Sequence, residues 1–159
     1  MQCRKTWTMG MGLLLAVGGL LFEGGLPQAR GQGECSLASL HGKYIFRDDG
    51  VIIQDNQQLP FAVAGIQTYN GDGTLSSQLT QSLNGEITQH SFTGTYTVEP
   101  TKCTGTFTLM DEHDGTLLHF DQFLSPDGNE LTFVHTDPGF VSSASQRRVT
   151  RFQTLDGKK

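Results

Sequence analysis

The chain has 159 residues, of which 36% are hydrophobic and 17% charged, and its formal net charge at pH 7 is −5. This length suits a single domain built around one hydrophobic core. The acidic balance argues against nucleic-acid partners, because non-specific binding to RNA or DNA depends on clustered Lys and Arg side chains that displace phosphate counterions.

Residues 1–31 predict a secretory signal peptide. Arg4 and Lys5 precede an apolar run, MGMGLLLAVGGLLF, that is short for a membrane span. Pro27 ends this run, and Ala29 and Gly31 are small residues at the −3 and −1 positions of a cleavage site after Gly31. We therefore expect an exported protein, secreted or periplasmic, whose mature part has no membrane span.

The cysteines predict one disulfide. Removal of residues 1–31 takes away Cys3 and leaves Cys35 and Cys103, an even number in an oxidising compartment. A bridge that closes a loop of roughly 70 residues restricts the unfolded chain by about 4 kcal/mol. Glu34 argues against a lipid anchor on Cys35, because a small residue precedes the modified cysteine in lipoproteins. A reactive thiol pair is the other alternative, but the CxxC spacing is missing.

The rest of the sequence alternates apolar and polar residues with period two, which predicts an all-β fold. Turn signals rich in Asn, Asp, Gly and Pro separate the expected strands at 70–73, 84–86, 99–102, 111–115 and 125–129. A looser serine-containing loop precedes the last strand, and residues 154–159 are expected to form a frayed tail. The expected strands are 42–47, 59–70, 74–83, 87–98, 103–110, 116–124, 130–136 and 146–153.

Eight strands joined mostly by short turns predict a small antiparallel up-and-down β-barrel, which forms a single domain over residues 35–153. Closure of the sheet removes the unpaired edges that promote aggregation. The repeated words GTYTV and GTFTL support this fold. Their threonines alternate with Tyr96 and Val98 in the first word and with Phe107 and Leu109 in the second, as in strands with one wet and one dry face.

Four segments carry a resemblance to a known group of proteins: CSLASLHGKYIF, FAVAGIQTYNGDGTLS, GTYTVEPTKCTGTFTL and LHFDQFLSPDGNELTFVHTDPG. Together they resemble exported bacterial proteins of unknown function that have a CS-x-x-x-L-x-G-x-Y opening, a G-x-G-T hairpin and a GTYTV…CTGT centre. The resemblance covers essentially all of the mature chain. It implies a calycin-type β-barrel similar to allene oxide cyclase and dirigent-like barrels, whose catalytic residues match no motif here.

Aromatic residues at alternating strand positions are the candidate lining of the barrel. An apolar interior of a few hundred cubic ångströms would bury a small hydrophobic ligand, although the same side chains could fill a closed core. The expected lining residues are Phe46, Phe61, Phe92, Phe107, Phe120 and Phe133.

The histidines suggest a polar group beside this lining. His119 and Asp121 are two residues apart on one expected strand, and the turn at 125–129 could bring His135 opposite His119. Two imidazoles and a carboxylate suit Zn²⁺ or another transition metal, but the strand register is open, and a slip by one residue moves His135 to the other face. We expect a weak polar site on one side of the two strands, without a metal or other cofactor.

Two charged clusters have alternative interpretations. Arg147, Arg148 and Arg151 are either a solvated surface or a rim that recognises an anionic head group, and Arg147 or Arg151 is a candidate for the mouth of the barrel. The acidic residues at 111–114 lack the spacing of a calcium loop and indicate a hairpin turn.

No sequence motif for a nucleophile is present: G-x-S-x-G is missing, and so is a spare thiol. The leading prediction is a non-catalytic exported barrel that binds a small apolar ligand or acts as an interaction module at the cell envelope. The alternative is a cyclase or isomerase of the allene oxide cyclase type, with proton transfer by His119 or His135 and a carboxylate. A third hypothesis is a structural protein whose outer face pairs with a partner.

Overall fold

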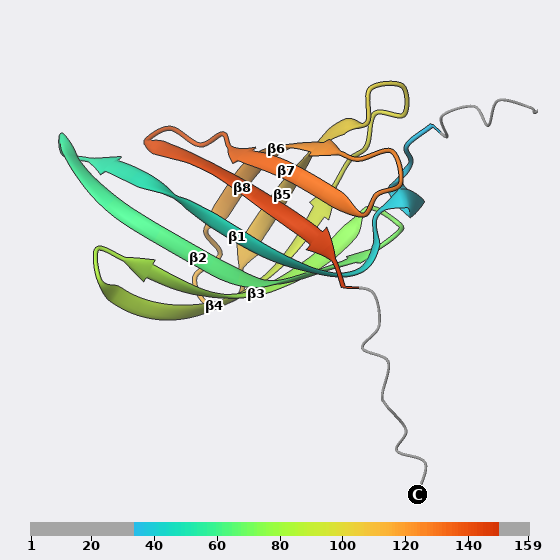
Figure 1. Cartoon of the computed structure of the whole chain (residues 1–159). Helices are drawn as coiled ribbons and strands as arrows, with labels where there is room; N and C mark the ends of the chain where they lie inside the picture. The colour runs from blue at the N-terminus through green and yellow to red at the C-terminus, as the bar shows by residue number, and fades with distance from the viewer. Residues whose placement is uncertain (1–33, 150–159) are drawn as a thin grey trace, which may run out of the picture. The chain divides into compact units, whose positions relative to one another are not determined.

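The computed structural model describes residues 34–149, and they form a closed antiparallel barrel of eight strands in chain order (Figure 1). The predicted small all-β barrel is thereby confirmed. The predicted signal peptide, Arg151 and the tail at 154–159 lie outside the described residues. The elements are η1 (Leu37–Ser39), β1 (His41–Gln54), β2 (Gln57–Asn70), β3 (Thr74–Leu83), β4 (Glu86–Tyr96), β5 (Thr104–Asp111), β6 (Leu117–Leu124), β7 (Glu130–His135) and β8 (Phe140–Arg148).

Strands β1 and β8 differ most from the predicted boundaries. β1 was predicted to end at residue 47 but continues to Gln54, where a tight turn at Asp55 and Asn56 leads into β2. Both turn residues have positive φ angles, 51° and 62°, which Asp and Asn tolerate better than most residues. β8 was predicted at 146–153 but covers the serine-containing segment, because its inward Ala144 and Gln146 alternate with outward serines.

The strands bury one face in the barrel interior. Tyr96, Phe107 and Leu109 of the repeated words are at most 4% exposed, as their alternation predicted. The first residue of each repeated motif, Gly94 or Gly105, must be glycine for a steric reason. A Cβ atom on Gly94 would collide with the carbonyl oxygen of Thr108, and one on Gly105 would collide with that of Thr97. At Gly94 and Gly105, therefore, the neighbouring backbone is too close for a side chain.

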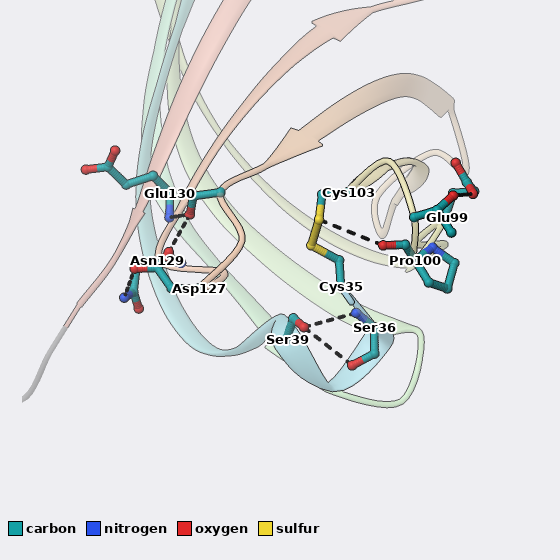
Figure 2. Close-up of a disulfide and its surroundings, with 11 residues drawn as sticks. Cys35, Ser36, Ser39, Glu99, Pro100, Cys103, Asp127, Asn129 and Glu130 are labelled. Atoms are coloured by element: carbon teal, nitrogen blue, oxygen red, sulfur yellow. Dashed lines mark hydrogen bonds between the residues drawn. A yellow bond between two sulfur atoms is a disulfide. The ribbon is translucent and has the colours of Figure 1, made fainter. Parts of the chain in front are cut away.

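One end of the barrel is closed by the N-terminal segment. The predicted disulfide joins Cys35 to Cys103, whose Cα atoms are 5.2 Å apart, and Figure 2 shows it beside η1 and the β4–β5 turn. The backbone N–H of Cys35 donates to the carbonyl of Pro100 at 3.2 Å. The hydroxyl of Tyr96 donates to the carbonyls of Leu37 at 2.8 Å and Leu40 at 3.1 Å. These contacts fix η1 over this end.

Arg148, at the end of β8, ties the same end together. Its guanidinium donates to the hydroxyl of Tyr44 and to the carbonyls of Ser39 and Gly128, and it lies 5.4 Å from the centroid of the Tyr44 ring. The basic cluster is therefore divided, since Arg148 is a structural residue of the closed end. The hairpins β1–β2, β3–β4, β5–β6 and β7–β8 all lie at the opposite end, which we call the mouth.

Candidate functional site: the mouth cavity

The half of the barrel near the mouth contains a cavity of about 70 Å³. All six predicted phenylalanines line it, and each is at most 9% exposed. The expected volume of a few hundred cubic ångströms is wrong, because the rings pack against one another. Phe107 stacks on Phe120 with centroids 4.4 Å apart, and Phe133 meets both rings edge-on at 5.2 and 5.5 Å. We call this space the mouth cavity; its wall also contains Asp48, Ile52, Val63, Gln67, Leu79, Gln81, Leu109, Leu118, His135 and Phe140.

The expectation of a wholly apolar interior is also wrong. Gln67, Gln122 and Gln146 project inward and are at most 3% exposed. The amide of Gln67 donates to the hydroxyl of Tyr69 at 2.8 Å, and the amide of Gln122 donates to the carbonyl of Thr97 at 3.0 Å. Burial raises the pKa of the Tyr69 hydroxyl, so this group stays neutral. A polar layer therefore accompanies the aromatic lining inside the barrel.

Asp48 is a buried carboxylate in the cavity wall. It lies on the inward face of β1 in line with Tyr44 and Phe46, and it is 7% exposed. Its Oδ2 accepts a long hydrogen bond of 3.5 Å from the hydroxyl of Ser142, whereas Oδ1 has no partner within residues 34–149. Burial raises the pKa of the Asp48 carboxyl from 3.8 to about 6.

His135 is a buried imidazole in the cavity wall. Its side chain is 3% exposed, and its ring stacks on Phe140 with centroids 3.8 Å apart. The backbone N–H of Asp137 donates to His135 Nδ1 at 3.3 Å. Burial lowers the pKa of the imidazole, so the ring is neutral at pH 7. Because Nδ1 accepts the backbone N–H of Asp137, the proton is assigned to Nε2. Nε2 is buried and has no partner in the described part of the chain.

The predicted arrangement of the two histidines is wrong. β6 and β7 pair with Phe120 opposite His135, so His135 faces inward while His119 and Asp121 lie on the outer face. Both imidazoles nevertheless meet Asp137. The Asp137 carboxylate is 2.7 Å from His119 Nδ1 and 3.4 Å from His135 Nδ1. Although burial opposes it, hydrogen bonds from His119 lower the pKa of the Asp137 carboxyl, so Asp137 stays ionised at neutral pH. Residues 34–149 contain no group of three His, Cys, Asp or Glu side chains arranged to hold a metal ion.

Arg147 does not lie at the mouth. Arg147 is on the outer face of β8, and Arg151 lies outside the described residues. Arg147 borders an outer hollow of about 600 Å³ that also contains Ile45 and Phe123. An adjoining hollow of about 420 Å³ shares Phe123, which is 51% exposed.

A histidine–aspartate pair, His90 and Asp111, lies near the mouth. His90 Nδ1, on β4, lies 2.7 Å from Asp111 Oδ2 at the end of β5. The predicted hairpin turn after Asp111 is confirmed: Asp111 and Asp114 accept the backbone N–H groups of His113 and Thr116, each at 2.8 Å.

Asp48 was missed from the sequence because the first strand was predicted to end one residue before it. The sequence contained a signal for it, because Asp48 continues the alternation of the inward residues Tyr44 and Phe46. A charged residue at the inward position of such a series indicates a functional group, because burying a carboxylate is unfavourable without a partner.

Comparison of the chain with protein-family models, with curated proteins and with solved structures finds no match. Fold and site together define a small disulfide-linked eight-stranded barrel whose aromatic cavity has a buried carboxylate and a buried imidazole in its wall. Among the described residues, no helix is long and apolar enough to cross a membrane.

Proposed function

We propose that this protein is an exported barrel that binds a small, largely apolar molecule in the mouth cavity. The observation that carries the proposal is the pair of buried atoms Asp48 Oδ1 and His135 Nε2, which lack partners within residues 34–149 although aromatic side chains surround them. A buried polar group without a hydrogen bond destabilises a fold by about 1–3 kcal/mol. A ligand that pairs with these atoms would remove this penalty.

The cavity volume limits the size of the ligand. About 70 Å³ is half of the roughly 150 Å³ of an apolar cavity known to hold benzene. The cavity therefore accepts the end of a compound with a few non-hydrogen atoms. A longer compound must extend out of the mouth past Ile52, Phe61 and Phe140, so a whole fatty acid or terpenoid does not fit inside.

Export is supported by the predicted signal peptide and by the disulfide, a bond that is typical of oxidising compartments. We expect protein recovered from the periplasm or the medium of its producing cells to begin close to residue 32. Sequencing of the mature N-terminus checks this, and recovery of an uncleaved chain in the cytoplasm would contradict it.

Ligand binding can be tested with four compact probes that share one 3-methylbutyl group: 3-methylbutan-1-ol, 3-methylbutan-1-amine, 4-methylpentanoate and 1-chloro-3-methylbutane. We expect at least one of them to give saturation-transfer NMR signals with the mature protein. Leu118→Phe should abolish these signals, because Leu118 lines the cavity. Leu117→Phe is the matched control, since the neighbouring Leu117 is 51% exposed on the outer face. If no probe binds, or if Leu118→Phe binds normally, the proposal fails.

A second candidate function is proton transfer, in keeping with the cyclase or isomerase alternative. The observation that favours it is that one cavity contains a carboxylate with a pKa of about 6 and a neutral imidazole N–H. Asp48 would take a proton from the carbon next to a carbonyl, while His135 Nε2–H donates to the carbonyl oxygen, and the proton would then return to carbon. Deuterium exchange into 4-methylpentan-2-one in D₂O, lost in Asp48→Asn, is expected. Exchange at the buffer rate would exclude this function.

A further inference from the structure

We infer that the ligand of the mouth cavity is a neutral compound with a hydroxyl group at its buried end. This inference rests on the proposed binding function. Asp48 Oδ1 and His135 Nε2 have opposite requirements, because the ionised carboxylate accepts hydrogen bonds and the neutral imidazole N–H donates one. A single hydroxyl oxygen can donate to the first group and accept from the second.

Asp48 and His135 line the same cavity, and the strand register places them on the same part of the wall. Asp48 of β1 is the partner of Ala144 on β8, and Ala144 is the partner of Phe133 on β7. His135 lies two residues beyond Phe133 and faces the same way, so a single strand separates the two polar residues. The inward side chains of β8 there are the small Ala144 and Ser142, and the hydroxyl of Ser142 donates to Asp48 Oδ2.

Charge excludes an anionic ligand. A carboxylate or phosphate in the cavity would face the ionised Asp48 among aromatic side chains, where like charges are poorly screened. It would also lose its own hydration without a cationic side chain in the cavity wall to replace it.

An ammonium group is the closest rival. It can donate to Asp48, and the aromatic faces of the wall attract cations. However, an ammonium group has no acceptor atom, so His135 Nε2–H would stay unpaired and would point its partial positive charge at the ligand. A hydroxyl satisfies both groups, whereas an amine satisfies one and an alkyl chloride neither.

The four 3-methylbutyl probes test the inference, because they differ in the polar group alone. At about pH 7.5, where Asp48 is ionised, we expect the alcohol to bind at least tenfold more tightly than the chloride and the carboxylate, and several-fold more tightly than the amine. Dissociation constants come from ligand-observed NMR titrations of the mature protein.

Two variants with apolar replacements complete the design. Asp48→Leu and His135→Phe should each reduce the preference for the alcohol over the chloride to less than threefold. Binding of the chloride shows in the same experiment that the cavity is intact. The matched controls are Asp49→Leu and His113→Phe, which make the same replacements at an exposed aspartate and an exposed histidine outside the cavity and should keep the full preference.

The outcomes separate the two proposals. Tighter binding of the amine or the carboxylate would overturn the inferred ligand class while leaving ligand binding established. An alcohol preference that survives in both apolar variants would overturn it as well. Failure of all four probes to bind would instead remove the proposed function itself.

Discussion

Asp48 is the residue at which stability and the proposed function conflict. A carboxylate that is 7% exposed, with one oxygen unpaired, is unfavourable in the ionised form, and this is why its pKa is raised to about 6. An uncharged residue of the same shape would suit the fold better at neutral pH. A group that destabilises the fold in this way is typical of binding and catalytic sites.

We predict that Asp48→Asn stabilises the protein in a pH-dependent way. The folded-state pKa lies above the value of 3.8 for an unperturbed carboxyl, so the wild type loses stability as the pH rises from about 4 through about 6. The variant should therefore gain up to about 2–3 kcal/mol in unfolding free energy above pH 7 and nothing below about pH 4. Urea denaturation at both pH values measures the difference.

Asp49→Asn serves as the control for this experiment, because Asp49 is the outward neighbour of Asp48 and is exposed. It should change stability by less than about 0.5 kcal/mol at either pH. A gain of equal size at low and high pH in Asp48→Asn would contradict the assignment of a raised pKa to Asp48.

For single residues, the sequence predicted which apolar side chains face the barrel interior better than which polar side chains do. Alternation alone placed Phe46, Phe107 and Phe133 in the interior, because burial of a large ring leaves little choice of face. The same alternation applies to the histidines, because His119 is next to Phe120 and His135 is two residues from Phe133. It puts His135 inward and His119 outward, so the expectation that both project to one side conflicted with it, and the pairing of Phe120 with His135 fixes this arrangement.

At the scale of elements, the contact between β4 and β5 depends on glycine. We predict that Gly94→Ala lowers the unfolding free energy by about 1–3 kcal/mol, because the new Cβ atom would collide with the carbonyl oxygen of Thr108 and push the strands apart. Urea denaturation measures the loss. Thr95→Ala is the neighbouring control on the exposed face and should have a smaller effect. Equal stability of Gly94→Ala and wild type would show that the strands separate without cost.

The number of strands could be predicted from the sequence, but some of their ends could not. The turn after β1 was missed because its Asp55–Asn56 pair lacks the glycine that marks the other tight turns. β8 was missed in part because serine has little preference for strands. Its segment is a strand because β1 and β7 supply hydrogen-bonding partners on both sides, which is information from distant parts of the chain.

The whole molecule is asymmetric along the barrel, with a closed end that is tied by covalent and polar contacts and a mouth that contains the cavity. We predict that Cys35→Ala/Cys103→Ala lowers the unfolding free energy by about 2–4 kcal/mol, because the bridge closes a loop with a sequence separation of 68. This corresponds to a fall in Tm of roughly 8–16 °C. Binding of 3-methylbutan-1-ol below the lowered Tm should be unchanged, since the disulfide is at the other end.

Thermal unfolding with and without reductant checks this prediction. Reductant should lower the Tm of the wild type towards that of the double variant and leave the variant unaffected. A double variant as stable as the wild type would argue against the disulfide. A double variant that folds but no longer binds 3-methylbutan-1-ol would show that ligand binding at the mouth depends on the closed end.

The mouth cavity, with Asp48 and His135 in its wall, is the binding site that we propose. The most direct test is an NMR titration of isotope-labelled mature protein with 3-methylbutan-1-ol, followed at assigned side-chain and backbone resonances. We expect shifts at Asp48, at His135 Nε2–H and at the Phe140 ring, with none at Tyr44 and Arg148 of the closed end. Shifts confined to the outer hollow around Phe123, or no shifts at all, would contradict it.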